Sequence, residues 1–212
     1  MKKITRKKHL EMKLQSIPNH PKPKVGLEQY TTPATIASDL VWNAFSLGDI
    51  ENRNIVDLGC GTGVFAIASA LMGSASSVGV DVDGDSISLA FDVKDKLNVD
   101  NADFIVSDIC EFNPALDVDT VFQNPPFGSQ KKADSGQDLK FVDKAIDLNP
   151  DVLYSFHMAS TQDFLIGYYE DNNLEITHIF RYNFPIPKIY EFHTKENQNV
   201  NVIVIRAEFN IF

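Results

Sequence analysis

The sequence has only two cysteines, Cys60 and Cys110, in 212 residues. Two cysteines are too few for a disulfide framework, and neither belongs to a Cys-x-x-Cys pair or to a His/Cys cluster with metal-ligand spacing. We therefore predict no metal site, and we expect both thiols to be small, reduced side chains of the core.

Long apolar runs are also missing. No run approaches the roughly 18 apolar residues needed to span a bilayer, and the basic N-terminus is not followed by the apolar core of a signal peptide. We therefore expect a cytoplasmic protein with no membrane partner.

Positive charge is scarce over most of the chain. The formal net charge is -10, yet residues 1–24 hold eight of the 19 lysines and arginines against one acid, Glu11. The remainder has 19 − 8 = 11 basic and 29 − 1 = 28 acidic residues, a balance of -17. Such a body does not bind nucleic acid through bulk charge. We divide the chain into a basic arm, 1–24, and a single domain, 25–212; the arm is either a solvated tail or a segment that holds phosphates.

Strand-like apolar runs alternate with helical patterns five times, and two alternating segments, 175–184 and 200–209, follow. This order predicts an α/β fold: a doubly wound, mostly parallel seven-stranded sheet with an antiparallel C-terminal edge hairpin. Near the N-terminus, Ile4, Leu10, Leu14 and Ile17 predict a short basic helix with a narrow apolar edge.

Polar residues mark the expected starts of three later helices. Thr32 is predicted to cap a helix whose first residue is Pro33. Asp83 is the expected cap before 86–97, and Ser160 is the expected cap of the helix that carries Phe164.

A glycine-rich stretch, Asp57-Leu58-Gly59-Cys60-Gly61-Thr62-Gly63, connects an apolar run to a buried helix that begins at Val64. Glycines at a strand-to-helix turn let a ligand approach the backbone, and the helix N–H groups point toward it. The pattern alone is weak, but Asp81 ends the next apolar run about twenty residues later, where a carboxylate binds ribose hydroxyls. Asp108 ends the third run, where a carboxylate can accept a hydrogen bond from an adenine amino group.

The stretch Asn124-Pro125-Pro126-Phe127 follows the apolar run 120–123. Two consecutive prolines cannot lie in a central strand, so Asn124 is predicted at the strand's carboxyl tip. Ligands of open parallel sheets bind at this edge. An amide, a proline carbonyl and an aromatic ring there suit recognition of a flat polar group; the alternative is a stiff turn without a ligand.

This combination resembles the class I S-adenosylmethionine-dependent methyltransferase fold, and Asn124 to Phe127 is similar to the motif of enzymes that methylate planar nitrogens. The resemblance extends over nearly the whole chain to the methyltransferase-like protein 5 family, with an archaeal member expected. It rests on six stretches in the family's order and spacing: Lys22-Pro23-Lys24, Leu27-Glu28-Gln29-Tyr30, Asp57 to Gly61, Asn124 to Gly128, Arg181-Tyr182 and Phe192-His193.

The resemblance implies methylation of adenosine N6 in small-subunit ribosomal RNA, with S-adenosylmethionine as cofactor and a small zinc-containing activator subunit as partner in a heterodimer. It places Asn124, Pro125, Pro126 and Phe127 at the target base. The implied cofactor residues are Gln29, Thr32, Asp57, Gly59, Gly61, Thr62, Gly63, Val64, Asp81 and Asp108. RNA would be held by the basic arm, the Lys131-Lys132 loop, the 188–195 segment or the partner.

Three other functions stay open. A protein glutamine N5-methyltransferase shares the Asn-Pro-Pro motif, although about fifty residues before Val56 leave little room for the helical domain that usually precedes it. A catalytically silent cofactor-binding subunit is the second, and methylation of a small molecule is the third.

Overall fold

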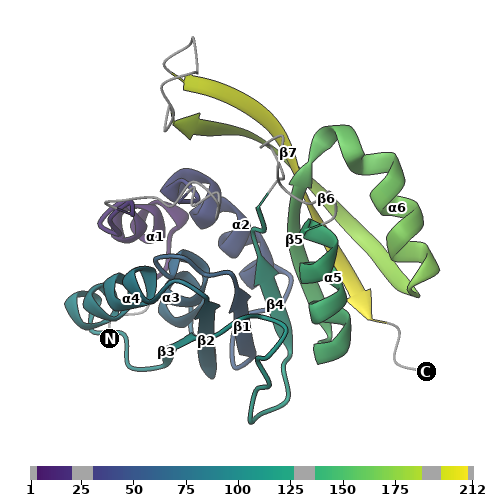
Figure 1. Ribbon diagram of the computed structural model, residues 1–212. Coiled ribbons are helices and arrows are strands. Elements are labelled where there is room, and N and C mark those ends of the chain that lie inside the picture. The colour runs from purple at the N-terminus through teal and green to yellow at the C-terminus, as the bar shows by residue number, and fades with distance from the viewer. Residues whose placement is uncertain (1–3, 21–30, 127–136, 188–196, 210–212) are drawn as a thin grey trace.

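A computed structural model describes residues 4–20, 31–126, 137–187 and 197–209. Its central feature is a seven-stranded sheet with helices on both faces (Figure 1). The elements in chain order are α1 (Lys7–Leu14), α2 (Ala34–Ser46), β1 (Asn54–Leu58), α3 (Val64–Leu71), β2 (Ser76–Asp81), α4 (Gly84–Leu97), β3 (Ala102–Val106), β4 (Thr120–Gln123), α5 (Gln137–Leu148), β5 (Val152–Met158), the 3-10 helix η2 (Ala159–Thr161), α6 (Gln162–Asp171), β6 (Leu174–Pro187) and β7 (Asn197–Phe209).

The strand order is β3-β2-β1-β4-β5-β7-β6. The pairs among the first five strands are parallel, whereas β7 runs antiparallel to both β5 and β6. The predicted fold class is therefore confirmed. The direction of winding reverses between β1 and β4, whose last residues, Leu58 and Gln123, are register partners. Open α/β sheets bind their ligands at such a switch point.

Two apolar cores lie on opposite faces of the sheet. Helices α1 to α4 cover one face, where Phe122 stacks between Phe65 and Tyr154 at ring-centroid distances of 5.4 and 4.9 Å. Helices α5 and α6 cover the other face, to which Leu153 points. Neighbouring residues of a strand thus enter different cores, as the two-residue period of a strand requires.

The predicted apolar edge of the N-terminal helix is confirmed, because Ile4, Leu10, Leu14 and Ile17 are all buried. Lys7 Nζ also lies 2.6 Å from Asp39 Oδ1 on α2. These residues are part of the packed body rather than a solvated tail. The boundary at residue 24 stays a prediction, since residues 21–30 lie outside the described part.

Two of the three predicted helix caps are wrong. Pro33, with φ −55° and ψ 140°, is itself the N-cap of α2, so the helix begins at Ala34 and Thr32 does not cap it. Ser160 lies inside η2, because the chain leaves β5 through a 3-10 turn before α6 starts at Gln162. The third prediction is confirmed: Asp83 caps α4 and accepts a hydrogen bond from the Asp85 N–H at 3.3 Å.

Within the described ranges, none of the helices is long and apolar enough to cross a membrane. The same part of the chain brings together no group of three or more His, Cys, Asp or Glu residues that could hold a metal ion.

Candidate active site

A cavity of about 420 Å³ lies at the carboxyl ends of β1, β2 and β4, at the switch point of the sheet. It brings together most of the residues that the sequence predicts: Thr32, Asp57, Gly59, Gly61, Thr62, Val64, Asp81, Asp108, Asn124 and Pro126. Gly63 and Pro125 lie next to lining residues without lining the cavity themselves. Gln29 and Phe127 fall outside the described residues.

The turn after β1 uses its glycines for different purposes. Gly61 has φ +52°, and a Cβ built on it would meet nothing within 4 Å, so its backbone is open to a ligand. Gly63 has φ +83° and ends the turn at the start of α3. A Cβ at Gly63 would come within 2.6 Å of the Phe104 ring. Gly63 therefore allows the Phe104 ring to pack closely against the turn, while Gly61 leaves the backbone of the cavity wall uncovered by a side chain.

Two carboxylates are held in the wall by backbone N–H groups. Asp57, at the end of β1, is 1% exposed and accepts a hydrogen bond from the Ala66 N–H in α3 at 3.0 Å. Its burial raises the pKa of this carboxyl from 3.8 to about 7. Asp81 accepts from the Gly61 N–H at 2.8 Å and from the Asp83 N–H at 2.9 Å. Burial also raises the pKa of Asp81.

The predicted acid after β3 lies at the cavity rim. Asp108 is exposed, and its Oδ1 accepts a hydrogen bond from the Cys110 N–H at 2.9 Å. The expectation that both thiols belong to the core is wrong for Cys110, which is exposed and lines the same rim. Cys60 is buried as expected. The chain forms no helix between β3 and β4, and Cys110 is exposed among the described residues.

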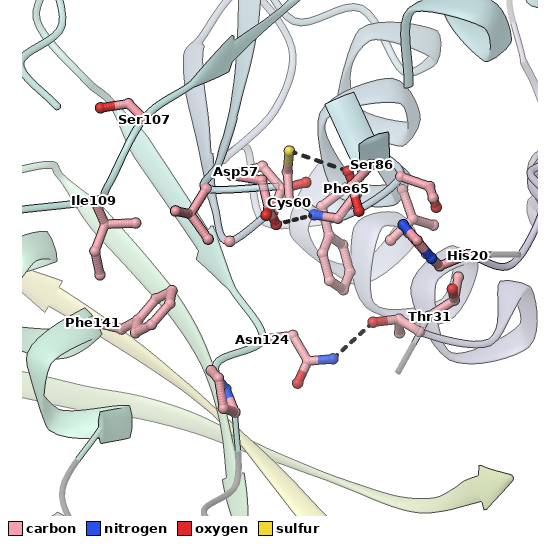
Figure 2. Close-up of a pocket in the computed structure, with 18 of the residues that line it drawn as sticks. His20, Thr31, Asp57, Cys60, Phe65, Ser86, Ser107, Ile109, Asn124 and Phe141 are labelled. Atoms are coloured by element: carbon pink, nitrogen blue, oxygen red, sulfur yellow. Dashed lines mark hydrogen bonds between the residues drawn. The ribbon is translucent and has the colours of Figure 1, made fainter. Parts of the chain in front are cut away.

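Asn124 occupies the tip of β4, as predicted, and its side chain points across the cavity toward the segment that holds Thr31 and Thr32 (Figure 2). Asn124 Nδ2 donates a hydrogen bond to Thr32 Oγ1 at 3.0 Å. Its Oδ1 is buried with no hydrogen-bond partner in the described structure, and the same is true of Thr62 Oγ1. A buried acceptor without a partner costs about 1–3 kcal/mol. Two such atoms beside one cavity indicate a polar ligand.

Comparisons with known proteins agree with this geometry. Residues 35–150 match the family model of the methyltransferase small domain. Protein MJ0284 of Methanocaldococcus jannaschii is 43% identical over 97% of this chain and 95% of its own length. The rRNA N(6)-adenosine-methyltransferase METTL5 of Danio rerio is 33% identical over 94% of this chain and 97% of its own length. The chain belongs to the METTL5 methyltransferase family. Among solved structures, PH1948 of Pyrococcus horikoshii, described as a candidate RNA methyltransferase, is 35% identical with a TM-score of 0.87, covering 98% of this chain and 100% of that one.

Several cavity residues of this methyltransferase were missed by sequence reasoning. They are His20, Thr31, Cys60, Phe65, Val82, Ser86, Ser107, Ile109, Cys110, Lys140 and Phe141. Phe141 is the most informative, because a Cβ at Gly59 would lie 2.8 Å from its ring. The glycine thus leaves room for an aromatic side chain from α5 (Figure 2). Only its helical setting after a polar loop could have drawn attention to Phe141.

A series of buried polar side chains supports β4 on the face of the sheet that α5 and α6 cover. Gln123 Nε2 donates to Ser155 Oγ at 2.8 Å, and Ser155 Oγ lies 2.8 Å from His157 Nε2. His157 Nδ1 lies 3.3 Å from Asp138 Oδ2 in the first turn of α5, and this contact lowers the pKa of Asp138. These contacts thus connect Gln123, the residue before Asn124, to the first turn of α5.

The raised pKa of Asp57 predicts a pH-dependent stability for the cofactor-free methyltransferase. The folded state binds the Asp57 proton more tightly than the unfolded state, so this group's stabilising contribution is complete below about pH 3.8 and is lost as pH rises to about 7. Because one pKa unit corresponds to about 1.4 kcal/mol, the free energy of unfolding falls by at most about 4 kcal/mol over this pH range.

Asp57→Asn removes this titration and keeps an oxygen for the Ala66 N–H. We expect it to melt at a higher temperature than wild type at pH 8, with the difference shrinking toward pH 4 in a thermal-shift series. If the difference in melting temperature between Asp57→Asn and wild type did not vary with pH, the raised pKa of Asp57 would be contradicted.

Proposed function

We propose that this enzyme transfers a methyl group from S-adenosylmethionine to the exocyclic N6 of an adenosine in small-subunit ribosomal RNA. The observation that carries the proposal is the unpartnered, buried Oδ1 of Asn124, a residue that lines the switch-point cavity. The name rRNA N(6)-adenosine-methyltransferase, which the relatives from Danio rerio and Drosophila melanogaster bear, supports the choice of substrate.

The cavity wall suits the proposed methyl donor. Its bare backbone at Gly61, the orphaned hydroxyl of Thr62 and the two buried carboxylates match a ligand that carries an ammonium group and ribose hydroxyls. We assign Asp81 to the ribose hydroxyls and Asp108 to the adenine amino group. The remaining contacts are assigned to Thr32, Asp57, Gly59, Gly61, Thr62 and Val64, with Gly63 shaping the turn and Gln29 contributing from outside the described residues. When bound, the cofactor supplies an electrophilic methyl group.

The target amine needs positioning more than it needs a base. Its lone pair is delocalised into the adenine ring, so the amine is a weak nucleophile. Asn124 Oδ1 and the Pro125 carbonyl would each accept one N6–H, which aims the lone pair and stabilises the developing positive charge. Pro125 and Pro126 keep both acceptors rigid. Phe127, outside the described residues, would stack on the extruded base, worth about 1–3 kcal/mol.

RNA phosphates require basic surface, which this acidic chain offers in few places. Arg6, the N-cap residue of α1, and Lys8 within α1 are exposed, while the apolar edge of the helix is buried. We propose that α1 holds phosphates, together with the Lys131-Lys132 loop and the 188–195 segment, which lie outside the described residues. We also propose a cytoplasmic location, which suits an enzyme that acts on ribosomal RNA.

We also propose a small zinc-containing activator subunit that forms a heterodimer with this chain. Strand β3 supports it, because β3 ends the sheet on one side and exposes Ile105 and Val106 at 41% and 56%. Exposed, unpaired strand edges tend to acquire partners. Adding the activator should raise both solubility and turnover; full activity of a stable, isolated chain would contradict an obligatory partner.

Radiolabelled methyl donor offered with three acceptors separates the candidate substrates. We expect label in small-subunit ribosomal RNA and none in a release factor or in free nucleosides. Label in the release factor would identify a glutamine methyltransferase, and label in nucleosides a small-molecule enzyme. Absence of label in all three, with and without the activator, would indicate a silent subunit.

A further inference from the structure

His20, the last residue of the described segment 4–20, lines the cavity together with Asp81, and Figure 2 shows its ring directed toward that cavity. We propose that His20 is a positioning residue for S-adenosylmethionine, which acts through Asp83 on the carboxylate of Asp81. The inference rests on the proposed function, because it assumes that Asp81 binds the ribose hydroxyls. It brings the N-terminal segment into the cofactor site, where the family resemblance implies no residue before Gln29.

A buried pair joins His20 to the start of α4. His20 Nε2 lies 3.2 Å from Asp83 Oδ2, and the two side chains are 5% and 1% exposed. A carboxylate oxygen only accepts hydrogen bonds, so the ring nitrogen that faces it carries the hydrogen. Burial removes competing water, which makes such a contact stronger than the same contact at the surface. The pair therefore holds the end of the N-terminal segment against Asp83, the N-cap of α4.

Asp83 connects His20 to Asp81 through its own backbone. The Asp83 N–H donates to Asp81 Oδ1 at 2.9 Å, while the Gly61 N–H donates to Asp81 Oδ2 at 2.8 Å. Each carboxylate oxygen of Asp81 thus keeps a lone pair for a ribose hydroxyl, in a fixed direction. The Asp83 side chain is held in turn by Ser86 Oγ, which donates at 3.3 Å to Oδ2, the oxygen that faces His20.

The charges around Asp81 favour the same role for His20. Burial raises the pKa of Asp81, and backbone N–H groups lower it. Of the nearby charged groups, the Asp83 carboxylate raises this pKa and His20 lowers it. The ionised form of Asp81 is the one whose two oxygens can both accept from ribose hydroxyls. Loss of His20 would remove an interaction that favours this form.

The N-terminal segment is itself anchored in the core. Leu14, at the end of α1, and Ile17 are both buried. Lys7 Nζ lies 2.6 Å from Asp39 Oδ1 on α2. Because His20 ends this anchored segment and faces the cofactor cavity, docking of the segment and binding of the cofactor are coupled. Each must then strengthen the other by the same factor.

Two variants of the full chain test the proposal by calorimetric titration with S-adenosylmethionine. His20→Phe keeps a flat ring and removes the N–H, and we expect the dissociation constant to rise about 10-fold, as for a lost hydrogen bond to a charged group. His20→Gln keeps an N–H donor at a similar reach and should restore most of the affinity. His178→Phe makes the same change at an exposed histidine of β6 that does not line the cavity, and this control should bind as wild type does.

A double variant distinguishes positioning through Asp83 from other roles. Asp83→Asn keeps an oxygen for the cap of α4 and removes the carboxylate that His20 faces. If His20 acts only through Asp83, then His20→Phe adds little further loss of affinity in the Asp83→Asn background. Full additivity of the two losses would overturn the proposal, because His20 would then act on the cofactor by itself. Wild-type affinity in His20→Phe would also overturn it.

Amide hydrogen exchange separates this coupling from a general change in stability. In wild type, saturating S-adenosylmethionine should slow the exchange of α1 amides more than that of α6 amides, since no residue of α6 lines the cavity. His20→Phe should lose this difference between the two helices. Equal slowing of both helices in wild type would contradict the coupling.

The binding measurements contain no RNA, which separates this inference from the proposed function. If His20→Phe weakens cofactor binding but wild type methylates no RNA, only the proposed substrate fails. If wild type methylates RNA and His20→Phe binds the cofactor normally, only the inference fails. A wild type that does not bind S-adenosylmethionine overturns both.

Discussion

Asn124→Ala is expected to reduce methyl transfer to RNA by about 10²–10³-fold, the usual effect of removing one preorganised polar group from a reacting centre. The alanine removes the only side-chain acceptor that we place at the target amine, so the lone pair of N6 is no longer aimed at the methyl group. Asn124 Oδ1 is buried and unpartnered, and Nδ2 donates to Thr32. Losing one such hydrogen bond costs about 1 kcal/mol of stability, so the loss should fall mainly on turnover rather than on folding.

Cofactor affinity should change little, because the carboxylates and the glycine turn that we assign to the cofactor are untouched. Single-turnover transfer and calorimetric titration with S-adenosylmethionine measure the two quantities separately. Asn172→Ala, at the C-cap of α6 far from the cavity, serves as the matched control and should transfer at the wild-type rate. Near-normal transfer by Asn124→Ala would contradict the proposed chemistry.

Arg206→Leu is expected to have the largest effect on folding. The guanidinium of Arg206 binds Asp49 through two bonds, Nε to Oδ2 at 2.8 Å and Nη2 to Oδ1 at 3.0 Å, and both side chains are more than 90% buried. Tyr154 donates a further hydrogen bond to Asp49 Oδ2 at 2.5 Å. Removing one partner of a buried ion pair leaves an uncompensated charge and costs about 3–5 kcal/mol.

The cluster of Asp49, Tyr154 and Arg206 also links three parts of the fold, because its hydrogen bonds connect the segment between α2 and β1 to β5 and β7. Arg206 pairs in register with Tyr154 on β5 and with His178 on β6. Chemical denaturation of Arg206→Leu should therefore show a lower midpoint.

Arg53→Leu is the matched control. Arg53 also binds an aspartate, Asp151, at 3.0 Å, but its side chain is 42% exposed. Exposed pairs contribute about 1 kcal/mol or less. Equal losses of unfolding free energy in the two variants would contradict the account of a buried pair.

Features of the fold that depend on local pattern could be read from the sequence. The two prolines after 120–123 placed Asn124 at a strand tip, since neither can join a central ladder. The burial of Leu10 and Leu14 followed from their spacing on a helix. The glycine turn and Asp81 were expected at one edge because the carboxyl ends of parallel strands meet there.

The errors share a physical cause. Capping rules describe a residue and its nearest neighbours, so they assigned the hydroxyl of Thr32 to the helix that follows it. Its actual partner, Asn124, is 92 residues away, and no local rule reaches that far. Cys110 was placed in the core by residue type, yet the β3–β4 connection that carries it forms no helix and leaves the thiol exposed among the described residues. Phe141 was missed because a helix pattern does not reveal which of its residues faces a ligand.

The measurement that tests the central claim most directly identifies the atom that is methylated. Small-subunit ribosomal RNA would be treated with wild-type enzyme and a deuterated methyl donor, digested to nucleosides and analysed by mass spectrometry, with Asn124→Ala in parallel. We expect deuterated N6-methyladenosine from wild type and almost none from the variant. Deuterium in any other nucleoside, or equal amounts of N6-methyladenosine from both proteins, would contradict it.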